Sequence, residues 1–508
     1  MVRVTELLVN SREYEAIQNA INDSITDDPR FPSMSPVQRA KKPPVKENPN
    51  LAAFRAATRV YIGTRGGLKV LQTLLAAVTT RQPGAKPRKN LIASPHRFAL
   101  SISTLLFFHR VLYRLITIIR LQLMHEKVKT IRSRWPRIFD LLTWKLAPAV
   151  GASLSGLALG ICPNDQLRIT IAIYVFVRAA ELLFQGAETA GYLKNRPKWM
   201  GSWILFALSQ GQLFHAFVFD PDCTPESYSS LMIKNTPEYI QKRPEGLSDK
   251  VVWPSDRQVV DGIADMARLR WPLYVSPILR PNDVTTLPAG VNPAISSITS
   301  RAHPALQSLS CALLHPSETS CFTPVLRQIL LSFNSFARGF TLYYSAFSLL
   351  RFRDLTKQPI PFLSDLMARI IKVTTVFCLS IAGSWGSICF FNNFLPKSLF
   401  PKFRIFLGGA VSGSIAIIDR SATAHENNMY AVRNSLSTLW KVGVKRRWWK
   451  SIKGGDVYIF VAALATLNML YDGMRETEVG RAGTMMAIKL LRGDIEVGLK
   501  TKQQDKDT

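Results

Sequence analysis

The stretch that decides the fold is Ala149-Val-Gly-Ala-Ser-Leu-Ser-Gly156-Leu-Ala-Leu-Gly160, an apolar segment stepped by small residues. A second stretch, Leu407-Gly-Gly-Ala-Val-Ser-Gly413-Ser-Ile-Ala-Ile-Ile418, has the same character, and Gly413 follows Gly156 by 257 residues. After a short polar break, each stretch leads into a segment that carries a tyrosine, Tyr174 in the first and Tyr430 in the second. An internal duplication of a pair of membrane helices is the simplest explanation.

Small side chains recur one helical turn apart in three of the apolar segments. Such a face lets two helix backbones approach closely inside lipid, where hydrophobicity alone does not draw helices together. In water the same glycines would weaken a helix by up to ~1 kcal/mol each. The pattern therefore favours membrane helices over the alternative, amphipathic helices of a large soluble protein. The predicted helix-packing residues are Ala152, Gly156, Gly160, Ala382, Gly386, Gly409 and Gly413.

Composition and charge agree with membrane segments joined to polar regions. The 508 residues are 47% hydrophobic with a mean hydropathy of +0.07, and the net charge is +29. The excess charge flanks apolar segments, with eight Lys or Arg against one Glu in 110–137 and six with no acid in 441–453. Basic residues in these places are typical of membrane anchors, so the lipid bilayer is the predicted partner. No nucleic-acid partner is expected, because no aromatic-basic platform accompanies the charge.

The order of polar and apolar segments predicts the organisation of the chain. We expect an all-α integral membrane protein with two homologous four-helix membrane units and amphipathic flanking helices. The predicted parts are a polar tail (1–48), a first membrane repeat (50–220), an extramembrane connector (221–325), a second membrane repeat (326–495) and a polar tail (496–508). The predicted spans lie near 98–122, 146–161, 168–188, 201–219, 369–392, 404–419, 428–443 and 456–472.

Two pairs of polar residues within the predicted spans are candidate sites. Arg178 and Glu181 lie one turn apart and could form an ion pair in the bundle, either for packing or along a solute path. His215 and Asp220 have the His-x4-Asp spacing of glycerolipid acyltransferases, in which the acid orients a histidine base. The companion phosphate-binding motifs are absent, and an interfacial histidine with a helix-ending aspartate is the alternative. We therefore predict no catalytic residue and no enzyme.

Cysteine and histidine are concentrated at the end of the connector. Cys311, His315 and Cys321 could bind Zn²⁺, with His303 or Cys223 as a fourth ligand. Their spacing is irregular for a zinc knuckle, and disulfide pairing or a structural turn are the alternatives. No metal and no cofactor are predicted on this basis. Cys378 and Cys389, inside an apolar run, are expected to be packing residues.

Three features resemble the transmembrane protein 135 family, which is itself distantly similar to peroxisomal membrane protein 4 and the mitochondrial inner-membrane translocase channel family. They are the duplicated glycine helix followed by a Tyr helix, the segment 225–231 around Tyr228, and the Cys/His-Pro module at 311–321. The resemblance implies a non-enzymatic multi-span protein of the peroxisomal membrane, or alternatively a mitochondrial one. It implies a role in lipid or fatty-acid handling or in organelle dynamics, with a translocase-like channel or metabolite pore as the alternative.

Two protein partners are also predicted. A second copy of the chain would give a homo-oligomer. Trp448 and Trp449 lie among basic residues, and we expect an interfacial anchor there. The alternative for this stretch is a docking patch for a membrane-protein import receptor.

Overall fold

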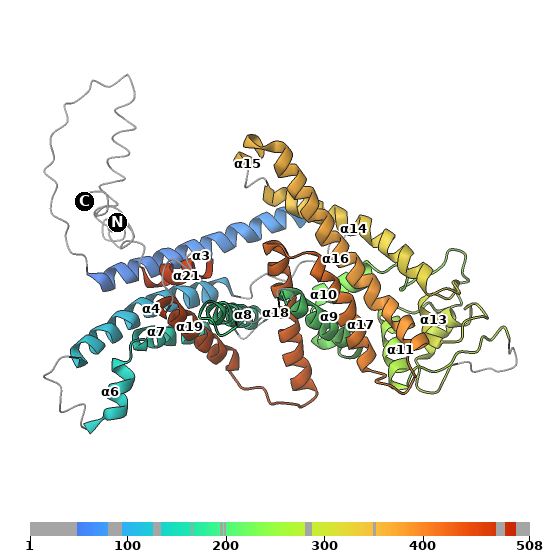
Figure 1. The fold of residues 1–508 in the computed structure, drawn as a ribbon, viewed down its shortest axis with the longest axis horizontal. Coiled ribbons are helices and arrows are strands. Elements are labelled where there is room, and N and C mark those ends of the chain that lie inside the picture. Colours follow the sequence, from blue (N-terminus) through green and yellow to red (C-terminus); the bar gives the residue numbers. More distant parts are fainter. Residues whose placement is uncertain are drawn as a thin grey trace, which may run out of the picture. The chain divides into compact units, whose positions relative to one another are not determined.

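The computed structural model describes residues 48–79, 94–124, 134–163, 166–193, 197, 200–279, 287–348, 352–473 and 483–493. Within these ranges the chain is helical and contains no β-strand, apart from an isolated antiparallel bridge between Leu273 and Ser308 (Figure 1). The predicted all-α class is therefore confirmed. The predicted tails, 1–48 and 496–508, lie almost wholly outside the described residues.

The chain forms two compact units, and it passes from one to the other twice. Unit 1 consists of the residues up to Lys194 together with those from Ile452 onward, and unit 2 is Asn195–Ser451. Unit 1 therefore combines the beginning and the end of the chain. Unit 2 is continuous in sequence.

Unit 1 is built around a helix that breaks at the glycine stretch. α7 (Ala147–Ser153) continues as the 3-10 helix η2 (Leu154–Ile161), and both pack against α4 (Pro95–Leu123). α3 (Pro49–Thr79) lies along the other side of α4, as Figure 1 shows. The remaining helices of the unit are α6 (Pro136–Thr143), α8 (Gln166–Thr189), α19 (Gly455–Gly473) and α21 (Gly483–Arg492). α19 packs on α7, η2 and α8 and completes the bundle.

Unit 2 repeats this set of neighbours with other helices. α17 (Phe403–Gly413) continues as the 3-10 helix η6 (Ser414–Ile418), and both pack against α16 (Pro359–Phe394). α14 (Phe322–Ser348) packs on α16 as α3 packs on α4, and the short α15 (Phe352–Lys357) lies between them in sequence. α9 (Ser202–Phe219) packs on α17, η6 and α18 (Ala422–Lys445), in the role that α19 has in unit 1.

The last predicted span of each predicted repeat thus packs in the unit that holds most of the other repeat. α9 belongs to the predicted repeat 50–220 but packs in unit 2, and α19 belongs to the predicted repeat 326–495 but packs in unit 1. The compact units therefore differ from the predicted division of the chain. The 257-residue spacing still relates them, since η2 ends at Ile161 and η6 ends at Ile418.

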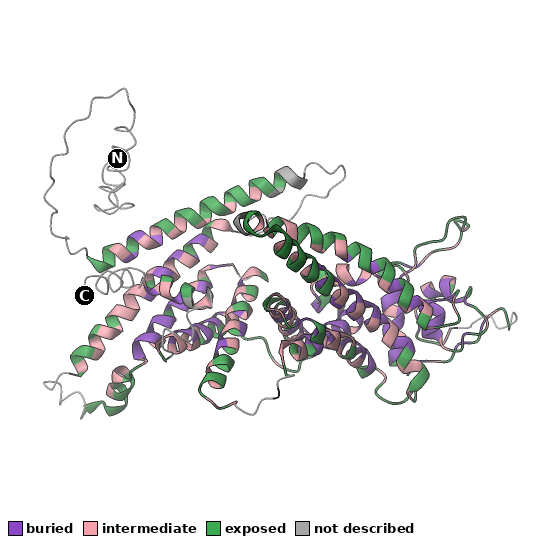
Figure 2. Cartoon of the chain, turned by 45° about the horizontal axis from the view of Figure 1, so that its top comes forward, coloured by how far each residue is buried: buried purple, intermediate pink, exposed green. Residues whose placement is uncertain are grey.

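The predicted connector is a packed helical lobe of unit 2. Its elements are η3 (Pro221–Cys223), α10 (Glu226–Lys234), α11 (Asp256–Arg268), η4 (Pro293–Ile295), α12 (Ser296–Thr299) and α13 (Leu309–Leu314). A capping box starts α11, because the Ser255 and Gln258 side chains each bond the other's backbone N–H. The buried residues of the lobe form one core with residues of α9 and α16, visible as the densest purple in Figure 2. At its centre the rings of Tyr239 and Trp385 stack with centroids 5.9 Å apart.

Fewer helices meet the criteria for spanning a membrane than the sequence predicted. In the part of the chain that the structure describes, three helices are long and apolar enough, namely α4, α9 and α16, and the bent pair of α6 with α7–η2 would make a fourth. The stretch Phe403–Ile418 is apolar but short. α8 is 24 residues long and carries Arg168, Arg178, Glu181 and Glu188, and it is not among these candidate spans.

The predicted small-residue faces lie mostly at helix contacts. A Cβ placed on Gly409 would lie 2.9 Å from the Gln210 carbonyl oxygen and 2.9 Å from the Gly211 Cα on α9. In unit 1 a Cβ on Gly156 would lie 3.0 Å from the Val461 side chain of α19. Gly413 likewise faces α9, Gly386 faces Val325 of α14, and Ala152 and Ala382 are fully buried, whereas Gly160 has nothing within 4 Å.

Substituting Gly409 by alanine should destabilise unit 2, because the new methyl group meets backbone atoms that cannot rotate away. We expect a loss of about 1–3 kcal/mol, the usual cost of overpacking. Gly339→Ala on α14 is the matched control, since nothing lies within 4 Å of its Cβ position. That change should be neutral or should stabilise by roughly 0.5–1 kcal/mol through the helix preference of alanine. Thermal unfolding of the purified protein in detergent would measure both, and equal effects would contradict the close contact.

Candidate functional site

Three cysteines and a histidine of unit 2 converge on one point. The ligand atoms of Cys311, His315, Cys321 and Cys389 all lie within 4.8 Å of one another. The Cys311 and Cys321 sulfurs are 3.7 Å apart, and the Cys389 sulfur is 3.5 Å from the His315 Nε2. Cys311, His315 and Cys389 are buried, and Cys321 is half-buried. Sequence analysis found the first three residues and missed the fourth.

Local structure explains how three of these side chains meet. The His315 N–H donates to the Cys311 carbonyl at 2.9 Å, so the two residues lie one turn apart on one face of α13. Pro316 follows and cannot continue the helix. The chain turns there, and it brings Cys321 back beside Cys311 immediately before α14 begins at Phe322. Cys389 comes from the last turns of α16, which packs against α13.

Polar neighbours hold the cluster in position. The Nδ1 of His315 lies 2.9 Å from the Glu318 carbonyl oxygen, which leaves the Nε2 facing Cys389. The Asn393 side-chain amide donates to the Cys321 sulfur at 3.5 Å. Its neighbour Asn392 donates to the Ser310 hydroxyl at 2.8 Å and ties the end of α16 to α13. The cluster thus has hydrogen-bonding support on both sides.

Neighbouring groups shift the pKa values of His315 and Cys321. Burial lowers the pKa of the His315 imidazole, but hydrogen bonds with Cys311 and Cys321 and with the Glu318 carbonyl outweigh it and raise that pKa to about 10. Hydrogen bonds with Cys311, Cys389 and His315 hold the pKa of the Cys321 thiol well below its usual range. A thiol with a lowered pKa is present as thiolate, the form that reacts and binds metals.

The structure bears on two of the alternatives left open by the sequence for this module, the disulfide and the fourth zinc ligand. A disulfide between Cys311 and Cys321 would need sulfurs about 2.0 Å apart, and all six cysteines are free. Neither predicted fourth ligand belongs to the group: His303 is exposed, and Cys223 packs with Ala216 and Val442. Cys378 is a buried core residue, as expected, whereas Cys389 is both buried and part of the cluster.

The predicted ion pair on α8 is present in the structure. The Arg178 guanidinium donates to the Glu181 carboxylate at 2.7 Å, and both side chains are largely buried. The same guanidinium lies 5.7 Å from the centre of the Tyr174 ring. On α18, Arg433 lies 5.9 Å from the Tyr430 ring in the equivalent arrangement. The two tyrosines of the predicted repeats are exposed, and each stacks with an arginine.

The arrangement of His215 and Asp220 does not resemble an acid-base pair. The Asp220 carboxylate accepts a hydrogen bond from Arg446 at 2.6 Å, and Lys445 lies 3.7 Å away. The His215 ring instead packs against Phe219, with centroids 4.7 Å apart. No hydrogen bond joins His215 to Asp220 among the described residues. In the structure Asp220 therefore binds the end of α18.

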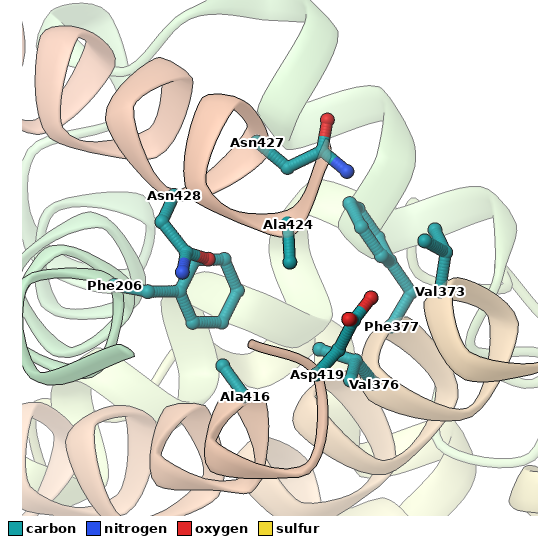
Figure 3. Close-up of a pocket in the computed structure, with 9 residues that line it drawn as sticks. All are labelled: Phe206, Val373, Val376, Phe377, Ala416, Asp419, Ala424, Asn427 and Asn428. Atoms are coloured by element: carbon teal, nitrogen blue, oxygen red, sulfur yellow. The ribbon is translucent and has the colours of Figure 1, made fainter. Parts of the chain in front are cut away.

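A small cavity near η6 is lined by two buried polar side chains, Asp419 and Asn428. Figure 3 shows Asp419 and Asn428 around it together with Phe206, Ala416 and Ala424. Its volume of about 20 Å³ suits a single water molecule, since one water needs roughly 10–15 Å³. Asn428 also donates to the Ser202 hydroxyl at 3.0 Å, so its role is to join α18 to the start of α9.

The last site residue named from the sequence, Tyr228, lies on α10 and packs on the lobe core. Its ring makes an edge contact with Phe217 of α9 at 6.4 Å.

Comparison of the chain with protein-family models, curated proteins and solved structures finds no match.

Substitution of Asp220 by asparagine should destabilise unit 2, because its buried carboxylate neutralises Arg446 at the end of α18. We expect a loss of about 1–3 kcal/mol, as for other hydrogen-bonded charges. Asp222→Asn is the control: that side chain is 82% exposed and bonds only Lys445, so its loss should cost less than about 1 kcal/mol. Denaturant unfolding would compare them, and an Asp222 effect as large as that of Asp220 would contradict this assignment.

Proposed function

We propose that this chain is an integral membrane protein of an organelle, peroxisomal in the first place and mitochondrial as the alternative. In this proposal it handles lipids or fatty-acid metabolites, or organises membrane dynamics, without enzymatic activity. The family resemblance of the sequence motifs supports the organelle and the lipid role. The observation that carries membrane insertion is the uncovered apolar surface of α4.

α4 has an apolar surface that the protein leaves open. Only 17% of its most apolar window is buried, compared with 44% for α16 and 56% for α9. Large exposed apolar patches are rare on soluble proteins and mark contact with membranes or partners. A helix of 29 residues is long enough to cross a bilayer. The exposed apolar residues of α4 are Leu100, Phe108, Leu115, Ile118 and Leu121.

α16 divides into an open half and a covered half. Ile360, Leu363 and Met367 near its start are exposed, whereas Ile381, Trp385 and Ile388 are buried by the connector lobe and α14. The open half also carries Asp365, Arg369 and Lys372, so its exposed apolar side chains do not form an uninterrupted surface.

An apolar groove on unit 1 supports lipid as the cargo. It has a volume of about 390 Å³ and lies between α4 and η2, with Phe108, Leu112, Leu157 and Ile161 among its lining residues. Such a lining suits an acyl chain and offers few partners to a hydrated ion. The groove therefore favours the lipid hypothesis over the alternative of a channel.

Membrane insertion can be tested with one charge on α4. Leu115→Arg should weaken insertion by about 2.5–3.5 kcal/mol, the cost of arginine near the centre of a span. Leu273→Arg is the matched control, because Leu273 is also an exposed leucine but lies on the connector lobe. Alkaline carbonate extraction of cell membranes should release more of the first variant and leave the second in the pellet. Release of the unchanged protein would overturn the proposal.

The lipid role needs a separate measurement. The purified protein in liposomes should accelerate the movement of a fluorescent fatty acid between leaflets or vesicles, and Leu157→Arg in the groove should reduce this rate several-fold. Fluorescent tagging beside peroxisomal and mitochondrial markers would test the organelle. Ion conductance without lipid movement would favour the channel instead.

A further inference from the structure

We propose that Cys311, His315, Cys321 and Cys389 bind one Zn²⁺ ion in a closed, structural site that fastens the connector lobe to α16. The proposal is independent of the lipid cargo. It concerns how the lobe is held to a candidate membrane span.

The spacing of the ligand atoms matches a tetrahedron around one zinc ion. With Zn–S near 2.3 Å and Zn–N near 2.0–2.1 Å, two sulfurs of such a site lie about 3.8 Å apart, and a sulfur and a nitrogen lie about 3.6 Å apart. The structure has 3.7 Å between the Cys311 and Cys321 sulfurs and 3.5 Å between the Cys389 sulfur and the His315 Nε2. All four ligand atoms lie within 4.8 Å of one another, close enough to bind one shared ion.

The chemistry of the ligands favours zinc over other biological cations. Three thiolates and an imidazole are soft and borderline ligands, which bind zinc well and magnesium or calcium poorly. The His315 ring is already oriented, because its Nδ1 bonds the Glu318 carbonyl and its Nε2 faces inward. A metal-binding histidine is usually held by its second nitrogen in this way. The Asn393 amide gives comparable support to the Cys321 sulfur.

The site has the features of a structural centre. All four positions of the tetrahedron are taken by protein ligands, so none is left for water or substrate. Binding is a ligand exchange without redox change: the imidazole of His315 and the thiols that still carry a proton release it to solvent as the His315 Nε2 and each sulfur replace waters on the ion. The ion would join three parts of unit 2 that are distant in sequence, namely α13, the turn before α14 and the end of α16.

Metal analysis of the purified full-length protein tests the proposal. We expect about one zinc per chain, and Cys389→Ser should lower the zinc content at least ten-fold. Cys378→Ser is the matched control, because Cys378 is also a buried cysteine on α16 in the same core but lies outside the cluster. It should keep its zinc. Equal zinc in both variants, or iron or no metal in the unchanged protein, would overturn the proposal.

A second measurement covers the case in which Cys389→Ser fails to fold. Zinc in the unchanged protein is exchanged for Co²⁺, and a tetrahedral site with three thiolates should give intense visible bands together with a sulfur-to-cobalt charge-transfer band. A weak octahedral spectrum would count against the site. Removal of zinc by a chelator should also increase protease cleavage within 303–321 several-fold, while cleavage in unit 1 stays the same. An unchanged pattern would contradict the fastening role.

Discussion

The structure of unit 2 depends on direct backbone contact between α9 and α17. Gly409 and Gly413 lie against Gln210, Gly211 and Ala207 with no room for a further carbon atom. This contact fixes the position of α9 along its own axis and therefore the position of Phe214 and Phe217 at its far end. Those rings make edge contacts with Trp385 at 6.0 and 6.3 Å, and the lobe core forms around them. The glycine steps thus determine both the bundle and the packing of the lobe.

Unit 1 uses the same plan with different chemistry. Its broken helix meets α19 through Gly156, and the start of α19 is tied to the start of α8 by Arg168 and Asp456 at 2.5 Å. In unit 2 the corresponding link between α18 and α9 is a neutral hydrogen bond from Asn428 to Ser202. Deeper in unit 1 the buried Asn468 donates to His109 and Ser153 and accepts from Arg492. The two units have similar helix neighbours, but their polar contacts differ.

The sequence predicted the helical class, the related glycine stretches and three of the four cluster residues. It could not predict that α9 packs in unit 2 and α19 in unit 1. A helix that fits the glycine face of one unit has nearly the same pattern of apolar residues as a helix that fits the glycine face of the other. Cys389 was assigned to packing because it lies 68 residues beyond Cys321 within an apolar run. A usable signal was present: two consecutive asparagines, Asn392 and Asn393, are unusual at the end of such a run, and both bond the module that carries the other ligands. The sequence also did not predict that the connector is a packed lobe, because its prolines suggested a loose segment.

The packing of α9 in unit 2 and of α19 in unit 1 also constrains the order in which the two units can fold. Synthesis proceeds from the N-terminus, and domains generally fold as their segments become available. The helices α4, α7 and α8 are complete by Thr189, yet their partner α19 begins only at Gly455. The last helix of unit 2 ends at Lys445, so the helices of this unit can pack together first. The glycine face of α7 and η2 must therefore stay uncovered until α19 has been synthesised, and that interval is when a chaperone or an insertase would be needed.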